Sequence, residues 1–531
     1  MLFNSYVFIF AFLPVVLAGY AWVRRFPERR WVIAWLVIAS LFYYAWWKPE
    51  FLLLLLTSVS VNAVFGKLLC DGRLSRPAAR AALVAGIVFN LGLLGYFKYA
   101  MFFTQTLNEL FGAGLTVPKI ILPIGISFIT FQKIAFLVDA HRGLVRNFTL
   151  QNYALFVTFF PQLIAGPIVH HAEMMPQFDK KPALHEFAAD LAVGFSIFCV
   201  GLFKKVVVAD SVAVYADAGY DMLKAGQPLD FVSAWITVLA YSFQLYYDFS
   251  GYSDMAVGLG RMFGIKLPVN FYSPYKATGI IDFWRRWHIT LSRFLRDYLY
   301  IPLGGNRHGA LRQALNIAVV MLLGGLWHGA NWTFVVWGGV HGVLLAINHA
   351  WNQLRLSRWR VFGSLSARAA FVALTFLAVT LAWVPFRADT LANAGQMLAT
   401  LFPTGTGLQE IRKSVGHFLA AQTAVFRDPA DFGLWFKARE LWPKVLPPDF
   451  IAGQRPVGLL LAGVAIATAL LPNTNQIFGR FQPVLGLTEA QLVHRATLTE
   501  LDWKVALAVS GLFVFSVLQL SRVSPFLYFQ F

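Results

Sequence analysis

Long apolar segments recur along the whole chain and alternate with short polar connections. A helix needs about 20 mostly apolar residues to cross a bilayer. Segments near that length are expected at 6–23, 31–47, 51–66, 82–103, 119–139, 150–169, 187–209, 230–247, 313–327, 332–350, 368–386, 456–472 and 504–521. Because segments such as 119–139 and 313–327 are expected to be tilted or re-entrant, the pattern predicts about eleven to thirteen membrane segments.

Two stretches interrupt this pattern of apolar segments. Residues 251–312 are rich in Gly, Pro, Trp, Tyr and Arg, and are too polar to cross as one helix. Residues 402–455 are rich in Pro and Gly, although apolar positions in 408–425 keep helical spacing. The chain shows no internal repeat. We therefore predict an all-α polytopic membrane protein with one domain, 1–531, and a surface excursion at about 402–455.

Composition supports a membrane protein and gives an orientation. The chain is 58% hydrophobic and 13% charged, whereas soluble proteins carry about 25% charged residues. The net charge of +18 is assigned to cytoplasmic loops, not to nucleic-acid binding. Odd-numbered connections hold Arg24, Arg25, Arg29, Arg30, Lys67, Arg73, Arg76, Arg80, Arg142 and Arg146. The N-terminus is therefore expected outside the cytoplasm, in a multi-pass inner-membrane protein.

The segment 282–300 carries the densest set of chemically useful side chains. Read as one helix, it places Trp284 and Trp287 on an apolar stripe, with Arg285 and Arg286 outside it. A basic amphipathic helix with tryptophans is typical of a membrane interface. The arginines are therefore either interfacial anchors or ligands for the phosphates of an acyl-CoA-type donor.

Three histidines lie in or beside apolar segments: His288, His328 and His341. An ionisable side chain at membrane depth is a functional-site hypothesis by default. For His328 a catalytic base is favoured when the resemblance described below is counted, with a structural hydrogen-bonding histidine as the alternative, whereas His288 is equally compatible with a catalytic and a structural role. For His341 a packed, hydrogen-bonded histidine is the favoured interpretation.

Further polar residues were considered for tunnel and metal sites. Asp248 and Asp254 can line a polar tunnel or orient an Arg or His, but a satisfied network at a helix end is the favoured interpretation. The pair His170 and His171 has no Cys or acidic pair nearby at ligand spacing, so no metal site is predicted.

Several motifs together resemble the membrane-bound O-acyltransferase (MBOAT) family, and within it the members that acetylate alginate. The matching phrases are LPIGISF at 122–128, IAGP at 164–167, YDFSGYSDMA at 247–256, FWRRWHI at 283–289, LRDYLY at 295–300, LGGNR at 303–307, GLWHGAN at 325–331 and SPFLYFQF at 524–531. The resemblance extends from the start to about residue 350 and returns at the tail, and 400–500 shows no match.

The resemblance implies a ring of tilted helices around a tunnel. It implies that His328 is the family's histidine and that His288 matches a second polar position. A neutral histidine can take the proton of an attacking hydroxyl, and donors around Asn331 or His288 can stabilise the oxyanion. Residues expected to line the tunnel or contact substrate are Trp327, Asn331, His341, Asp248, Asp254, Arg285 and Arg286.

The resemblance also implies a function. It predicts an O-acetyltransferase that passes acetyl groups from a cytoplasmic donor, acetyl-CoA, across the inner membrane to an exopolysaccharide, alginate. Extracytoplasmic O-acetyltransferase partner proteins are expected, and no bound cofactor. Alternatives within the family are cellulose, peptidoglycan and D-alanylation of teichoic acid. A secondary transporter would be expected to show repeats, which the sequence lacks, and a scaffold without chemistry is the third class considered.

Overall fold

The structure is a computed structural model that describes residues 1–145, 148–164, 166–179, 184–354, 364–403, 407–424, 457–522 and 527. Within these ranges the chain is helical, and one isolated β-bridge joins Pro268 to Leu485. The prediction of an all-α protein is therefore confirmed. The label α marks α-helices, and η marks short π- or 3-10 helices.

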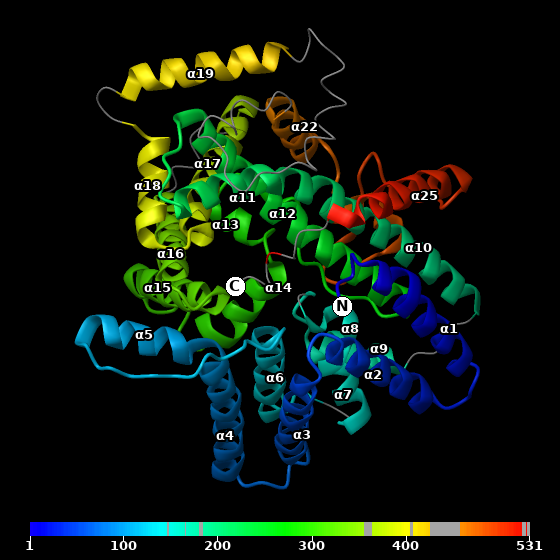
Figure 1. Cartoon of the computed structure of the whole chain (residues 1–531). Helices are drawn as coiled ribbons and strands as arrows, with labels where there is room; N and C mark the ends of the chain where they lie inside the picture. Colours follow the sequence, from blue (N-terminus) through cyan, green and yellow to red (C-terminus); the bar gives the residue numbers. More distant parts are fainter. Residues whose placement is uncertain are drawn as a thin grey trace.

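The first third of the chain forms a group of helices at one side of the molecule (Figure 1). They are η1 (Phe8–Phe12), α1 (Leu13–Val23), α2 (Arg29–Ala45), α3 (Glu50–Cys70), α4 (Arg76–Leu94), η2 (Gly95–Tyr99), α5 (Ala100–Phe111), α6 (Ile126–His141), α7 (Leu150–Thr158), α8 (Phe160–Leu163) and α9 (His171–Phe178). Within this group α3, α4 and α6 pack against one another.

The remaining helices include the long helix α12, which several of them contact directly. They are α10 (Leu184–Phe203), η3 (Lys204–Ala209), α11 (Asp210–Lys224), α12 (Phe231–Met262), η4 (Pro274–Lys276), α13 (Ile280–Trp284), α14 (Ile289–Leu295), η5 (Arg296–Tyr300), α15 (Gly309–His328), α16 (Trp332–Gln353), α17 (Leu365–Arg387), α18 (Leu391–Leu401), α19 (Gly407–Ala424), α22 (Val457–Leu470), α23 (Thr474–Ile477), η8 (Gly479–Phe481), α24 (Glu489–Leu492), α25 (Trp503–Leu518) and η9 (Leu520–Arg522).

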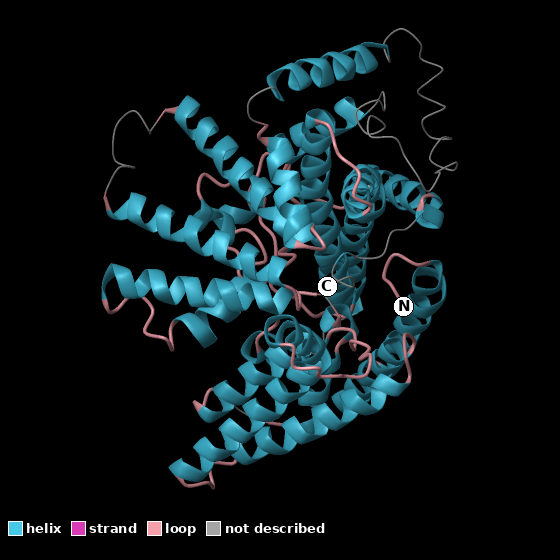
Figure 2. Ribbon diagram, turned by 60° about the vertical axis from the view of Figure 1, so that its left-hand side comes forward, coloured by secondary structure: helices cyan, strands magenta, loops and turns pink. Residues whose placement is uncertain are grey.

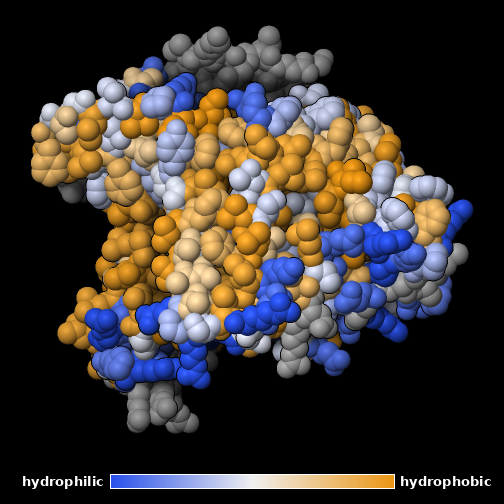
Figure 3. Space-filling model, turned by 90° about the horizontal axis from the view of Figure 1, so that it is seen from below, coloured by the Kyte–Doolittle hydropathy of each residue, from blue (hydrophilic) through white to orange (hydrophobic). Residues whose placement is uncertain are grey.

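Several helices are long and apolar enough to cross a membrane. By length and composition, six such spans occur in the described residues: Glu50–Cys70, Arg76–Phe111, His185–Lys224, Gly309–His328, Trp332–Gln353 and Leu365–Arg387. Shorter apolar helices cover Phe8–Val23, Val457–Leu470 and Trp503–Leu518. Apolar side chains cover much of the face in Figure 3, with hydrophilic residues gathered toward its edges. The protein is thus a multi-pass membrane protein.

The core forms where α10 crosses α12 at very short range. Gly194 and Gly201 on α10 face Gly258 and Gly251 on α12, so both helices present glycines seven residues apart. A Cβ atom added to Gly194 would lie 2.5 Å from the carbonyl oxygen of Gly258, and one added to Gly251 would lie 2.8 Å from that of Gly201. Small residues are the usual means by which membrane helices approach closely. The crossing therefore requires glycine at these positions.

The helices α15 and α16 form a tight hairpin whose turn begins at the buried Gly329. The two helices contact each other extensively. Figure 2 shows how such helices, joined by loops, make up the described chain. Gly325 on α15 and Gly338 on α16 face the partner backbone: an added Cβ would lie 2.2 Å from the carbonyl oxygen of Phe334 and of Met321, respectively. This close approach fixes the position of the turn that follows His328.

The expected single helix over 282–300 was wrong. The structure divides it into α13, α14 and η5. The break falls at His288, which has a left-handed backbone with φ of 42°, a conformation that few residues other than glycine adopt. The periodic stripe of apolar positions could not show this break, because its cause is a set of hydrogen bonds to a distant segment, described below.

The expected span at 150–169 is also interrupted. Helix α7 ends at Thr158, Phe159 has an extended conformation, and Pro161 lies in the first turn of the short α8. Proline cannot donate the backbone hydrogen bond that a continuous helix needs at this point. The apolar run is therefore buried as two short helices instead of one.

The predicted surface excursion at 402–455 is described only in part. Helix α19 confirms the helical spacing in 408–425, and its Ser414 hydroxyl accepts a 3.3 Å bond from the backbone N–H of Val232 at the start of α12. Residues 404–406 and 425–456 lie outside the described residues. The single-domain boundary of 1–531 stays a prediction.

The hairpin yields a test with neighbouring residues. We expect Gly338→Ala to lower the free energy of unfolding by about 1–3 kcal/mol, because its methyl group would overlap the Met321 carbonyl oxygen. Gly339→Ala is the control, since its Cβ would meet only Leu322 Cδ2 at 3.6 Å. The thermal midpoint of the purified protein in detergent measures both. Equal midpoints for the two variants would contradict this account of the packing.

Candidate active site

His328 is the last residue of α15 and is buried, with 5% of its surface exposed. The helix stops there because Gly329 is extended, and α16 starts three residues later with the Asn331 side chain accepting from Thr333 N at 3.1 Å. A helix end normally leaves four carbonyl groups without partners. Here that end lies inside the protein, so those carbonyls need donors from other elements.

The distorted helix η2 supplies those donors. Lys98 Nζ donates to the carbonyl oxygens of Trp327 and of His328, the latter at 3.1 Å, and to Ser127 Oγ at 3.3 Å. Tyr99 donates its hydroxyl to the carbonyl of Leu326 at 2.9 Å. Gly329 N–H reaches the carbonyl of Gly325, one position further back, at 3.4 Å. All four terminal carbonyls of α15 are thereby satisfied.

His288 is held by a directed chain of hydrogen bonds. Its Nδ1 lies 3.0 Å from Asn270 Oδ1, which also accepts from the Thr290 hydroxyl at 2.9 Å, while Thr290 accepts from Ile168 N at 3.0 Å. The Asn270 amide nitrogen donates to Ser253 at 3.1 Å, so its oxygen faces His288. Because an amide oxygen only accepts, His288 carries its proton on Nδ1, and Nε2 holds the lone pair.

The two candidate catalytic imidazoles lie close together. The ring centroids of His288 and His328 are 6.5 Å apart, and the ring of Trp327 lies 6.2 Å from His288 and 4.9 Å from His328. His288 is fully buried, and burial lowers its pKa to about 3. The imidazole of His288 is therefore neutral at pH 7, as acid–base chemistry by a lone pair requires.

Aromatic side chains enclose the other side of His328. Its ring centroid lies 5.1 Å from that of Trp337 and 5.3 Å from that of Phe386. The ring centroid of His341 lies 4.9 Å from that of Trp337 and 5.2 Å from that of Trp284. Neither ring nitrogen of His341 has a hydrogen-bond partner among the described residues. The expected hydrogen-bonded His341 is therefore not observed there, whereas its burial and packing are.

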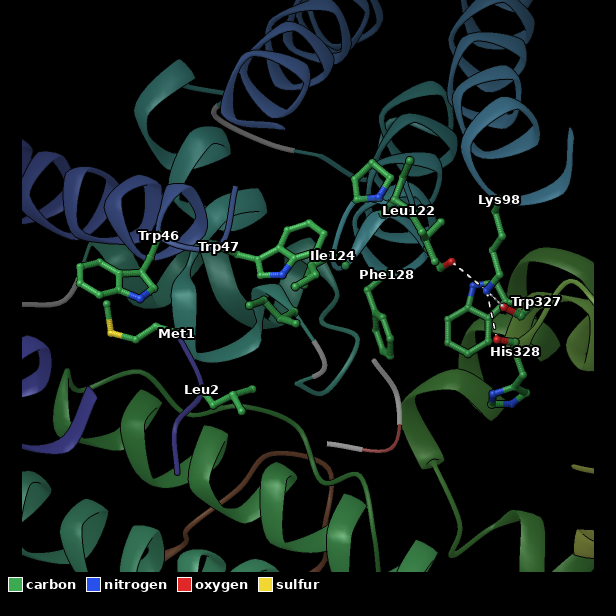
Figure 4. A pocket seen from close by; sticks show the side chains of 15 residues that line it. Met1, Leu2, Trp46, Trp47, Lys98, Leu122, Ile124, Phe128, Trp327 and His328 are labelled. Carbon is green, nitrogen blue, oxygen red and sulfur yellow. Dashed lines mark hydrogen bonds between the residues drawn. The ribbon is translucent and has the colours of Figure 1, made fainter. Parts of the chain in front are cut away.

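A cavity of about 510 Å³ opens beside His328. Lys98, Trp327 and His328 lie at one end, and Met1, Trp46 and Trp47 at the other (Figure 4). The segment 122–128, one of the motifs of the resemblance, forms part of the wall between them. A substrate in this cavity would therefore reach the histidine whose backbone Lys98 holds.

The remaining predicted residues have other partners. Asp248 pairs with Lys205 at 2.5 Å, and Asp254 pairs with Lys204 at 2.8 Å. Lysine is thus the partner of both carboxylates where Arg or His was expected, and both lie within α12, not at a helix end as expected. The tunnel role of both carboxylates stays a prediction.

The predicted donor-binding arginines and Asn331 lie as follows. Arg285 is exposed, and Arg286 pairs with Asp282 at 2.8 Å. The Asn331 amide donates to the carbonyl of Asp389 at 3.1 Å while its oxygen caps α16. The side chain of Asn331 is thus engaged at both ends in the hairpin turn.

The sequence analysis missed Lys98 and Asn270. Lys98 had a signal, because it is a lysine inside the apolar run 82–103, where an ionisable group is costly. Asn270 had none, because its role depends on the approach of His288 in space.

Comparison with known proteins identifies the architecture around these histidines. The sequence model of the MBOAT, membrane-bound O-acyltransferase family, matches residues 5–379, which include Lys98, Asn270, His288 and His328. The chain belongs to the MBOAT family. It is accordingly an acyltransferase, and the transporter and scaffold alternatives are not needed to explain its membrane histidines.

Relatives within the MBOAT family act on several cell-envelope polymers. The chain is 44% identical to the peptidoglycan O-acetyltransferase of Helicobacter pylori over 79% of this chain and 83% of that protein. It is 39% identical to the probable alginate O-acetylase AlgI of Pseudomonas aeruginosa over 100% of both chains. It is 30% identical to the teichoic acid D-alanyltransferase of Streptococcus thermophilus over 43% of this chain and 57% of that protein.

Lys98 provides the first test of the MBOAT site. Lys98→Met keeps the length of the side chain but leaves two carbonyls of α15 without their donor, at a cost of about 1–3 kcal/mol for each buried group. We expect acyl transfer to fall about tenfold or more. Acyl transfer is measured in membranes containing equal amounts of each protein. The exposed Lys119→Met is the control, and wild-type rates for Lys98→Met would show that this contact does not support the site.

Asn270 provides a second test. Asn270→Leu removes the oxygen that accepts from His288 and Thr290, so the proton on His288 is no longer fixed at Nδ1. We expect kcat to fall about tenfold, with a smaller change in KM, because a hydrogen bond at the acid–base group is lost. Asn352→Leu on the exposed end of α16 is the control. An unchanged kcat would show that the hydrogen bonds of Asn270 do not contribute to acyl transfer.

Proposed function

We propose that this chain takes acetyl groups from a cytoplasmic donor, acetyl-CoA, and passes them across the inner membrane for O-acetylation of an exopolysaccharide, alginate or a close analogue. The observation that carries the proposal is the pair of buried imidazoles, His288 and His328, 6.5 Å apart beside a cavity in an MBOAT chain. The AlgI proteins support the acetyl group and the alginate acceptor, because they match this chain over its full length.

In the proposed reaction His328 acts as the general base. Its neutral ring takes the proton of the acceptor hydroxyl as the oxygen attacks the thioester carbon. The tetrahedral intermediate then expels the thiolate, which takes up a proton, so a C–O bond replaces a C–S bond. General bases of this type contribute about 100- to 10,000-fold in rate. His288 Nε2 faces this chemistry as an acceptor, because its Nδ1–H is given to Asn270.

Donors for the oxyanion have to come from other side chains. The Nε1–H groups of Trp327 and Trp337 are buried without a hydrogen-bond partner among the described residues, and both rings lie about 5 Å from that of His328. Either can donate to the thioester oxygen as charge develops on it. We propose them in place of Asn331, whose amide is engaged by the carbonyl of Asp389.

The proposed orientation follows from charge. The connection before α2 holds Arg24 and Arg25, and α2 itself begins with Arg29 and Arg30. The connection before α4 holds Arg73, and α4 begins with Arg76. The positive-inside rule assigns both to the cytoplasm and the N-terminus to the outer side. The acetyl donor would then approach from the basic side. Partner proteins outside the cytoplasm would complete transfer to the polysaccharide.

A second acceptor is favoured by one specific observation. The peptidoglycan O-acetyltransferase of Helicobacter pylori shares 44% identity with this chain, above the 39% of the AlgI protein quoted above, although over a smaller part of it. Peptidoglycan is therefore the alternative polymer. Both polymers present sugar hydroxyls, so the same acyl-transfer chemistry would serve either one.

His328→Ala tests the proposed function. We expect the acetyl content of the polymer to fall at least about 100-fold, since the general base is lost. Ester-linked acetate is released by mild base from purified exopolysaccharide and from purified peptidoglycan, and the two are quantified separately. His308→Ala is the control, because His308 is exposed at the other end of the same helix.

The result shows which of the two polymers is the acceptor, and whether His328 is needed for acetylation. Loss of acetate from the exopolysaccharide alone supports the proposal, and loss from peptidoglycan alone replaces the acceptor. Wild-type acetate in both polymers, with His328→Ala present at normal levels in the membrane, would refute His328 as the base.

A further inference from the structure

A second cluster of polar side chains lies outside the catalytic cavity. Asp139 on α6, His170 and His171 at the start of α9, and Tyr298 on η5 converge there. One ligand atom each from Asp139, His170 and His171 lies within 4.8 Å of the others. The sequence analysis predicted no metal at the histidine pair because it saw no acidic ligand nearby. The fold supplies one from 31 positions earlier in the chain.

The surroundings of His171 resemble those of a metal-binding histidine, in which one ring nitrogen binds the ion and the other is hydrogen-bonded to the protein. Its Nε2 lies 3.4 Å from the carbonyl oxygen of Leu144, an atom that only accepts, so Nε2 carries the proton. Metal-bound histidines commonly direct their second nitrogen to a backbone carbonyl in this way. The tautomer leaves the lone pair of His171 on Nδ1.

That lone pair lies beside a carboxylate oxygen. His171 is 5% exposed, and its Nδ1 has no hydrogen-bond partner among the described residues, yet it lies 3.3 Å from Asp139 Oδ2. A lone pair on Nδ1 this close to a carboxylate oxygen is repelled unless a proton or a metal ion lies between the two atoms. A tetrahedral ion with ligand bonds of about 2.0–2.1 Å separates its ligand atoms by about 3.3 Å.

The remaining positions around such an ion are also present. His170 Nε2 lies 2.6 Å from Asp139 Oδ2, and the Tyr298 oxygen lies 2.6 Å from the same carboxylate oxygen and 2.8 Å from His170 Nε2. These three contacts have hydrogen-bond lengths, so an ion bonded to these atoms would have to separate them to about 3.3 Å. Tyr298 or a water would take the fourth position.

We propose that Asp139, His170 and His171 bind one divalent transition-metal ion, Zn²⁺ in the first instance. Two imidazoles and one carboxylate are a ligand set typical of zinc and of related first-row ions. On binding, the proton of His170 Nε2 moves to Nδ1, and that ring gives up its 3.4 Å contact with Ala172 N. Arg142 lies 3.8 Å from the other carboxylate oxygen, Oδ1, and leaves Oδ2 to the ion.

The position of the cluster assigns the ion a structural role. It would join α6, the start of α9 and η5, three elements that are far apart in sequence. The segment between Ile168 and His170 links the cluster to the active site, since Ile168 N–H bonds Thr290 in the His288 network. The ion would therefore hold one wall of the active site in place, and it would not take part in the acyl transfer.

Metal binding to the purified full-length chain tests this proposal. The protein is prepared without a histidine tag, treated with a chelator, dialysed and titrated with Co²⁺, whose visible absorption reports nitrogen and oxygen ligation, and with Zn²⁺ in competition. We expect one tightly bound ion per chain and a higher thermal midpoint with Zn²⁺ than without it. His171→Ala and Asp139→Asn should each weaken Zn²⁺ binding at least about tenfold.

The control variant is His185→Ala, because His185 is an exposed histidine on α10, outside the cluster. It should bind the ion as the wild type does. Absence of Zn²⁺ and Co²⁺ binding by the wild-type chain would overturn the proposal without reference to any variant. Undiminished binding by a folded His171→Ala would also overturn it and would place the ion elsewhere.

Discussion

The constraint on which this site depends is the burial of a helix end inside an apolar protein. Carbonyl groups without partners cost several kcal/mol each in such surroundings. The end of α15 at His328 is allowed because Lys98 and Tyr99, from the distorted helix η2, reach three successive carbonyls. The α15 helix can therefore end at His328 only because the distorted η2 places Lys98 within hydrogen-bond distance of its last carbonyls. His328 is the residue at that helix end.

The same logic accounts for His288. Both histidines lie where a helix is interrupted inside the protein, and such interruptions persist only where protein groups satisfy the exposed backbone. At His288 the strain of a positive φ is held by the bonds that join Asn270, Thr290 and Ile168. Strained backbone of this kind concentrates at functional sites. Here it holds a neutral imidazole whose ring centroid lies 6.5 Å from that of His328.

Sequence reasoning predicted the long helices and the importance of His328 better than it predicted where helices are broken. The apolar runs located α3, α15, α16 and α17 to within a few residues, because run length decides whether a helix can cross a membrane. The motif around His328 was found because an ionisable group there is costly. The break at His288 could not be found, since its cause lies in hydrogen bonds to distant residues. Lys98 carried a signal that was not used, as a lysine within an apolar run.

Enclosure of His328 by aromatic rings has a chemical consequence. Trp337 and Phe386 lie about 5 Å from its ring, and Trp327 covers a third side. A thioester activated beside a general base reacts with whichever hydroxyl arrives first, and water is the most abundant. Rings that exclude water from the base therefore suppress hydrolysis of the donor while a bound acceptor still reacts. We infer that the aromatic residues around His328 act in the choice between transfer and hydrolysis, and that the polar groups on the opposite side, led by Lys98, hold the base in position.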